Sequence, residues 1–136
     1  MTLIPDTVLD QVIDDAFDMI VLPGGLPGAD HLNNDPRIHT LLKRLSKEGK
    51  YIAAICAAPK VLAKAGLLDG HSATGYPGIL EKMDLPSVAV KSERLIVDDK
   101  VITSRGPGTA MDFALELVEK LVGSEKRTQV ENALVR

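Results

Sequence analysis

Apolar residues along this chain follow two different spacings. Short continuous runs of strand length occur at several places, most clearly at residues 18–22 and 51–55. Between them lie longer stretches in which apolar residues recur three and four positions apart. Runs of the first kind are typical of buried strands, and stretches of the second kind are typical of amphipathic helices. Because the two kinds alternate, the pattern predicts parallel βαβ units and therefore an α/β fold with a mostly parallel sheet.

The turn residues divide this pattern into expected elements. Strands are expected at residues 2–4, 18–22, 51–55, 72–74, 87–90, 95–97 and 101–103, the last two as a hairpin. Helices are expected at about residues 7–14, 36–49, 57–66, 109–123 and after Ser124. The segment from Gly24 to Asn34 is expected to be a loop because Gly, Pro and Asn are frequent in it. Expected helix caps are Asp35 before Pro36, Thr109 with Asp112 as a capping box, and Ser124.

The composition limits the class of protein. The 136 residues suit one domain, 1–136, and a hydrophobic content of 45% is enough for a core. Aromatic residues make up 3% and the net charge is −3, so no specific nucleic-acid binding is expected. No apolar run reaches the ~18 residues of a membrane helix, and the acidic start does not fit a secretory signal. We therefore expect a cytoplasmic protein without a membrane partner.

One cysteine, Cys56, is the main candidate for chemistry. It follows the buried run at 51–55 and precedes a helix, so its side chain is expected at the sheet edge where parallel strands end and ligands bind. The start of a helix there would favour the reactive thiolate. Core packing explains the sequence Ala-Ala-Ile-Cys-Ala-Ala equally well, so both interpretations stay open. A lone cysteine forms no internal disulfide and no cysteine cluster for a metal, and we expect neither metal nor cofactor.

Backbone groups near Cys56 are the next candidates. Gly24 and Gly25 follow the strand run at 18–22 and could aim an N–H at a ligand, next to Cys56 if the two strands are neighbours, with the Ala57 N–H as a second donor for an oxyanion. A tight turn is the simpler explanation of Pro23-Gly24-Gly25. Arg105 precedes a helix start and could hold an anion, although a capping loop explains it as well. No histidine is placed by its spacing to serve the cysteine; the three are His31, His39 and His71.

Three motifs together resemble the ThiJ/PfpI superfamily, on the branch of the parkinsonism-associated protein and bacterial YajL. They are residues 17–25 (FDMIVLPGG), 52–59 (IAAICAAP) and 103–109 (TSRGPGT), and their order and spacing cover nearly the whole chain. The resemblance implies a flavodoxin-like three-layer sandwich and usually a homodimer. It also implies an oxidisable nucleophile at Cys56, with oxyanion donors at Gly25 and Ala57. The activities that it implies are glyoxalase or deglycase chemistry on methylglyoxal and glycated groups, chaperone action and peroxide sensing.

Two departures from the family pattern concern the enzymatic role. The family carries about fifty residues ahead of the point that matches Met1, with a central strand, a helix and the Glu that contacts the cysteine. We therefore expect the C-terminal portion of the usual fold, without its first strand and helix. Tyr76 stands where some members have a histidine that partners the cysteine. Detoxification of reactive carbonyls through Cys56 is the first hypothesis, and a non-catalytic redox-sensing or chaperone-like protein is the alternative.

Overall fold

A four-stranded sheet forms the centre of the computed structural model, which describes residues 1–136. Its strand order is β1 (Met19–Leu22), β2 (Tyr51–Ile55), β6 (Val101–Ser104) and β5 (Leu95–Asp98). The first three strands are parallel, and β5 pairs antiparallel with β6 as the expected hairpin. Two short parallel strands, β3 (Ser72–Ala73) and β4 (Ala89–Val90), form a separate sheet. The α/β class and the mostly parallel sheet are confirmed.

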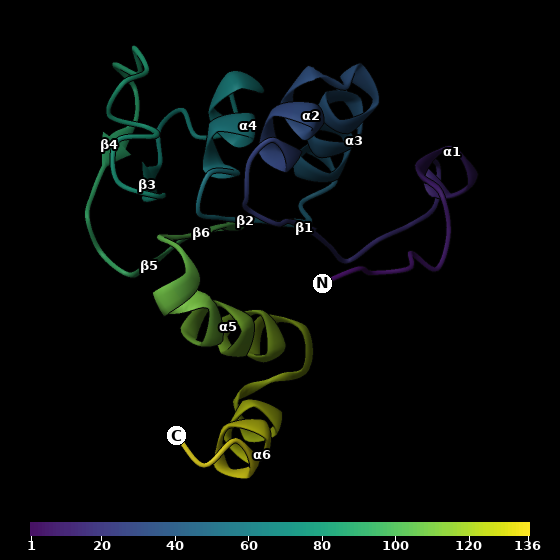
Figure 1. Ribbon diagram of the computed structural model, residues 1–136, viewed down its shortest axis with the longest axis vertical. Coiled ribbons are helices and arrows are strands. Elements are labelled where there is room, and N and C mark those ends of the chain that lie inside the picture. The colour runs from purple at the N-terminus through teal and green to yellow at the C-terminus, as the bar shows by residue number, and fades with distance from the viewer.

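Helices cover both faces of this sheet and produce three layers (Figure 1). One face carries α2 (Gly28–Asn34), α3 (Pro36–Lys47) and α4 (Pro59–Lys64). The opposite face carries α5 (Ala110–Val122), which packs against α6 (Ser124–Ala133). The short helix α1 (Leu9–Val12) lies to the side of β1. None of these helices has the length and apolar character needed to cross a membrane.

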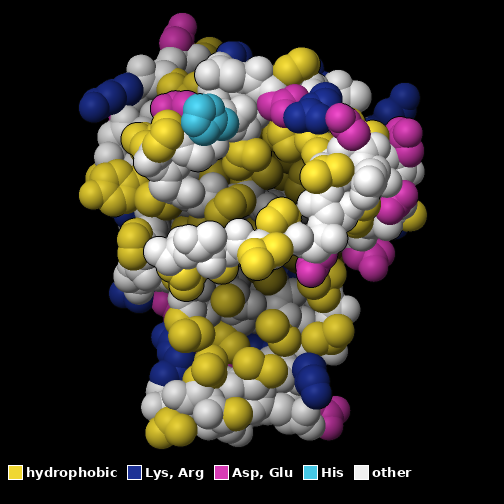
Figure 2. Space-filling model, turned by 45° about the vertical axis from the view of Figure 1, so that its right-hand side comes forward, with side chains coloured by type: hydrophobic (Ala, Val, Ile, Leu, Met, Phe, Trp, Pro, Cys, Tyr) yellow, Lys and Arg dark blue, Asp and Glu magenta, His cyan; other side chains and the backbone are white.

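The core is divided unequally between the two faces. Ile52 and Ala53 are adjacent on β2 and belong to different clusters, because successive strand residues point to opposite sides. The cluster beneath α2, α3 and α4 contains 13 buried residues, whereas the one beneath α5 contains Ala53, Ile102 and Phe113. Figure 2 shows hydrophobic side chains gathered on the lower half of that view, at the height of α5 in Figure 1. Exposed apolar residues of α5 include Met111, Leu121 and Val122.

Helix α3 forms where its apolar spacing and its cap predict it. The Asp35 side chain accepts a hydrogen bond from the Arg37 N–H at 2.9 Å, and Pro36 occupies the first turn. Its buried residues are Ile38, Leu41, Leu42 and Leu45, which recur at the spacing of one helix face. Such a cap contributes about 1 kcal/mol to the stability of the helix, and burial of this face contributes the larger share.

Several local expectations were wrong. Residues 2–4 form no strand and are exposed. The segment expected as a loop contains α2, because the N–H of Ala29 bonds to the Gly25 carbonyl and begins a helix that the glycine content had hidden. Gly123, in the left-handed region at φ 94°, precedes α6 in place of the expected cap Ser124. The capping box at Thr109 and Asp112 does not form either, and both side chains have other partners.

Candidate functional site

Cys56 lies at the end of β2 in an unusual backbone conformation. Its φ of 65° falls in the left-handed region, which residues with a Cβ adopt only at a cost. The Cys56 N–H donates to the Ser104 carbonyl at 3.0 Å, and the Tyr76 N–H donates to the Cys56 carbonyl at 2.7 Å. Both backbone polar groups are therefore bonded to segments from other strands. The result is a half-buried thiol at the sheet edge, where the sequence predicts it.

A pocket of about 220 Å³ opens beside this thiol. Its lining residues come from the ends of β1, β2 and β6 and the start of α5, and they are Gly24, Gly25, Ile55, Cys56, Gly106, Pro107 and Ala110. Gly24 and Cys56 are close because β1 and β2 are parallel neighbours, with Leu22 opposite Ala54, which is the condition under which the sequence places the two residues together. Apart from the thiol, no lining side chain is ionisable.

Gly24 lies so close to Cys56 that a larger residue does not fit. A Cβ at position 24 would stand 2.5 Å from the Cys56 Cβ and 3.3 Å from its Sγ. Gly25 has a different reason to be glycine, because its φ of 88° lies in the left-handed region. The backbone at Gly24 and Gly25 therefore has no side chains between it and the pocket of the thiol.

Backbone N–H groups near the thiol have no partners within the chain. The amides of Gly25 and Ala57 donate to no backbone carbonyl. The pocket lining includes Gly25 but not the buried Ala57, whose N–H directly follows the cysteine in sequence. Free amides beside a nucleophile are the groups that stabilise a negatively charged oxygen.

Tyr76 and Arg105 lie at the same edge of the sheet but do not line the pocket. The Tyr76 ring packs over Gly106, 3.4 Å from the position that a Cβ would take there, and half of the residue is exposed. The Arg105 Nη1 atom is 3.5 Å from the hydroxyl oxygen of Thr74. Both residues therefore border the wall formed by Gly106.

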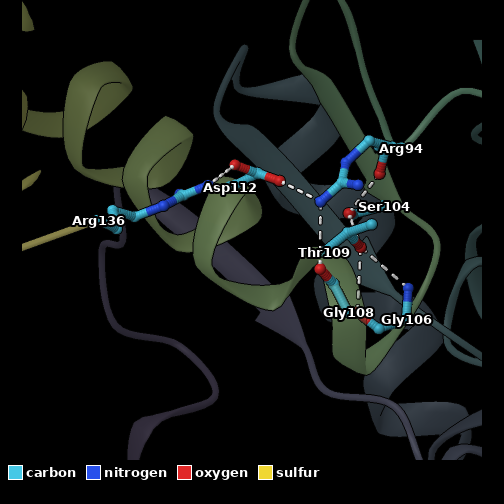
Figure 3. A network of polar contacts seen from close by, with 7 residues as sticks. All are labelled: Arg94, Ser104, Gly106, Gly108, Thr109, Asp112 and Arg136. Carbon is cyan, nitrogen blue, oxygen red and sulfur yellow. Dashed lines mark hydrogen bonds and ion pairs between the residues drawn. The ribbon is translucent and has the colours of Figure 1, made fainter.

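A chain of hydrogen bonds fixes this wall (Figure 3). The Gly106 N–H donates to the Thr109 hydroxyl at 3.1 Å, and that hydroxyl lies 2.7 Å from the Ser104 hydroxyl. Ser104 in turn donates to the Arg94 carbonyl at 2.7 Å. The Thr109 hydroxyl hydrogen has two acceptors within reach, the Ser104 hydroxyl oxygen at 2.7 Å and the Gly106 carbonyl at 3.0 Å, so these buried hydroxyl groups all have partners. Thr109 therefore closes the turn at Gly106, a role that its expected capping function had concealed.

Asp112 secures the outer end of the same segment (Figure 3). Its carboxylate accepts hydrogen bonds from Arg94 at 2.9 Å and from Arg136 at 2.6 Å. The hydrogen bond from Arg136, and after it the one from Arg94, holds the pKa of the Asp112 carboxyl below its usual value. Arg94 also donates to the Gly108 carbonyl at 3.2 Å and so connects α5 with the loop. Sequence spacing gave no signal for this pairing, because its partners are 18 and 24 residues away.

The histidines lie away from the pocket, and none is among its lining residues. His39 Nε2 is 2.8 Å from the Asn33 carbonyl, which can only accept, so this nitrogen carries a hydrogen. His71 Nδ1 lies 3.4 Å from an Asp98 carboxylate oxygen, beside the N–H of Ser72, which donates to the same side chain. These contacts connect structural segments and leave Cys56 without a histidine partner.

Comparison with known proteins gives consistent matches. The profile of the DJ-1/PfpI family matches residues 1–120. Protein DJ-1 homolog A of Arabidopsis thaliana is 41% identical over 134 residues, which cover 98% of this chain and 34% of that protein. The glutathione-independent glyoxalase DJR-1.2 of Caenorhabditis elegans is 41% identical over 124 residues, covering 91% of this chain and 66% of that protein. The chain thus spans about a third of the Arabidopsis relative and about two thirds of the nematode relative.

Solved structures superpose on nearly the whole chain. The crystal structure of Drosophila melanogaster DJ-1beta superposes with a TM-score of 0.93 and 42% identity, over 98% of this chain and 72% of that chain. A structure described as Toxoplasma gondii DJ-1, oxidized, superposes with a TM-score of 0.88 and 35% identity, over 96% of this chain and 70% of that chain. At these identities the likeness extends beyond the fold to the amino-acid sequence.

Proposed function

Because this chain belongs to the DJ-1/PfpI family, we propose that Cys56 adds to reactive carbonyl compounds and serves in their detoxification. Methylglyoxal and glycated groups are the proposed substrates. The observation that carries the proposal is the thiol in a small pocket beside Gly24, next to amides that have no partner in the chain. The deglycase, homodimeric and cytoplasmic expectations belong to the same proposal.

The chemistry begins with formation of one covalent bond. The Cys56 thiolate attacks the aldehyde carbon, and the electrons of the carbonyl π bond move to its oxygen. The N–H groups of Gly25 and Ala57 are suited to stabilise the resulting oxyanion, which then takes a proton to give a hemithioacetal. Only Cys56 changes its bonding among the protein groups. This step requires a nucleophile and hydrogen-bond donors, both of which lie at the pocket.

Conversion of that adduct to a hydroxy acid requires a further proton transfer. A base must remove the proton from the former aldehyde carbon, and the neighbouring carbonyl carbon must receive one, which gives a thioester of Cys56. Water must then attack that thioester, so that the C–S bond breaks, the hydroxy acid leaves and the thiol is restored. The pocket lining other than Cys56 consists of Gly, Ile, Pro and Ala, which cannot act as a base. Adduct formation is therefore the step that this geometry supports by itself, and it is measured separately from turnover.

The decisive experiment compares thiols at two positions of the same chain. Wild-type protein, Cys56→Ser, and Cys56→Ser combined with Ser46→Cys are exposed to methylglyoxal, and adducts are followed by intact mass. Ser46 is exposed on α3, so the third variant carries one thiol away from the pocket. We expect adduct formation and methylglyoxal loss to be at least about tenfold faster in the wild type than with the surface thiol. Equal rates for the two thiols would refute the proposal.

A second candidate function is peroxide sensing through the same cysteine. It is favoured by the half-buried thiol beside free amides, which could donate hydrogen bonds to the oxygens of a sulfinate, and by the relative described as Toxoplasma gondii DJ-1, oxidized. One peroxide would oxidise the thiolate to a sulfenate with release of water, and a second would give the sulfinate. Dilute peroxide should then add two oxygens to the wild type but not to Cys56→Ser. A chaperone-like role is part of this alternative.

A further inference from the structure

Arg105 differs from every other arginine of the chain in its electrostatic surroundings. The chain contains six arginines, and five of them form ion pairs with carboxylates. The paired ones are Arg37, Arg44, Arg94, Arg127 and Arg136. Arg105 forms no ion pair; the single polar contact of its side chain is the neutral hydroxyl of Thr74 at 3.5 Å. The chain has 19 acidic and 16 basic residues, so the missing ion pair of Arg105 does not reflect a shortage of carboxylates.

The guanidinium of Arg105 has hydrogen-bonding capacity that the fold does not use. It carries five N–H donors, and the contact with Thr74 lies at the outer limit for a hydrogen bond. Arg105 is only partly exposed, and Thr74 is completely buried. A partly desolvated guanidinium without an anion is less stable than one that is paired, and a planar carboxylate or a phosphate matches its geometry.

Its position connects this unused charge with the cysteine. Arg105 directly precedes Gly106, which lines the pocket of Cys56 and contacts the Tyr76 ring. Thr74 lies two residues before Tyr76, whose N–H holds the Cys56 carbonyl. The guanidinium therefore lies between two segments that both contact the cysteine or its pocket. The hydrogen bonds of Thr109 and Ser104 fix the backbone that follows it.

We propose that Arg105 binds an anionic group, a carboxylate or a phosphate, carried by the compound that reacts at Cys56. This inference rests on the proposed function and adds a preference among its substrates, for small carbonyl compounds with a negative charge near the reactive carbon. Neutral methylglyoxal would react without this contact. The hydroxy acid formed from it would carry the carboxylate that Arg105 recognises.

Two alkylating reagents test this selectivity at the reacting atom. Iodoacetate and iodoacetamide transfer similar groups: the Cys56 sulfur bonds to carbon, and iodide leaves with the electron pair of the C–I bond. Only iodoacetate carries a carboxylate. Because Cys56 is the only cysteine, intact mass gives both rates directly. We expect Arg105→Leu to lower the iodoacetate-to-iodoacetamide rate ratio about fivefold, the effect of one screened charge. Arg105→Lys should retain most of the ratio.

Arg37→Leu is the matched control, because it removes the same charge from α3. It should leave the rate ratio unchanged. Loss of the ratio in both variants would mean that net charge alone steers the reagent, and an unchanged ratio in Arg105→Leu would equally overturn the inference. Cys56 reacting with both reagents but not with methylglyoxal would count against the proposed function while leaving the role of Arg105 standing.

Binding without reaction provides a second readout, which does not depend on a reactive thiol. Lactate, inorganic phosphate and neutral lactamide are added to wild-type and Arg105→Leu protein, and the Tm is recorded. A ligand that binds only the folded state raises Tm with its concentration. We expect lactate or phosphate, but not lactamide, to raise the Tm of the wild type more than that of the variant. Equal responses of the two proteins to both anions would refute the inference.

Discussion

Replacement of Gly24 by alanine tests whether the pocket is as tightly built as its geometry indicates. The added Cβ would stand 2.5 Å from the Cys56 Cβ and 3.0 Å from the Ile55 carbonyl oxygen. Carbon atoms in contact prefer a separation of about 3.5–4.0 Å, so β1 and β2 must move apart by about 1 Å near their ends. Neither neighbour is the flexible end of a long side chain. The backbone must therefore move to accommodate the methyl group.

The expected cost follows from this overlap. Insertion of a methyl group into a closely packed site typically lowers the free energy of unfolding by about 1–3 kcal/mol. The displacement also moves the thiol away from the free N–H group of Gly25, which follows β1. Because a misplacement of about 1 Å can cost up to ~100-fold in rate, we expect alkylation of Cys56 in Gly24→Ala to slow by about tenfold or more.

Gly28→Ala provides the comparison. Gly28 begins α2 and lies outside the left-handed region, and a Cβ added there would meet no heavy atom within 4 Å. Urea unfolding at unchanged m-value measures both stabilities, and iodoacetamide measures both thiols. Gly28→Ala should remain within about 0.5 kcal/mol of the wild type and alkylate at the same rate. If Gly24→Ala matched it in both measurements, the close approach of β1 to Cys56 would be wrong.

Two further substitutions examine backbone strain and charge. In urea unfolding, Cys56→Gly should be about 1 kcal/mol more stable than Cys56→Ala, because glycine adopts a φ of 65° without strain. The control is Ala114→Gly within α5, where the same exchange of alanine for glycine should lower the free energy of unfolding by about 1 kcal/mol. A Cys56→Gly protein less stable than Cys56→Ala would contradict the left-handed conformation. The lowered pKa of Asp112 means that its carboxylate stabilises the fold above the usual aspartate pKa, and that this contribution disappears as the pH falls through the folded-state pKa. Asp112→Asn should therefore lower the free energy of unfolding by up to about 1 kcal/mol at neutral pH and have the same stability as the wild type in strong acid. Unfolding measured across that pH range checks this, and a difference in stability that does not change with pH would contradict the assignment.

The sequence predicted those parts of the fold that depend on contacts close along the chain. The apolar run at 51–55 and the spacing from Ile38 to Leu45 were sufficient for β2 and α3, because burial follows directly from these patterns. Helix α2 was missed because its glycine and asparagine content favours turns, while packing against α3 and α4 stabilises the helix. Residues 2–4 were expected to be a strand, but they have no neighbouring strand to pair with.

The candidate site was predictable to a similar extent. The sequence predicts that Gly24 and Cys56 both follow strand ends at one edge of the sheet. That β1 and β2 are neighbours, which brings the two residues together, comes from the structure. The hydrogen bonds of Thr109 with Ser104 and Gly106 were not predictable, because the same Thr-x-x-Asp spacing equally suits a capping box. Local sequence cannot distinguish between these outcomes. The position of Arg94 beside Asp112, brought about by the hairpin, decides which one forms.

The conformation of Cys56 and its surroundings depend on each other. A residue with a Cβ in the left-handed region costs roughly 1–2 kcal/mol, so neighbouring contacts must hold it there. Ser104 and Tyr76 do this through the two backbone hydrogen bonds of the cysteine. Ser104 is in turn fixed by Thr109, within the turn that also forms the pocket wall at Gly106. The contacts that maintain the strained thiol are therefore the same ones that shape its pocket, so a change in this turn alters reactivity and substrate fit together.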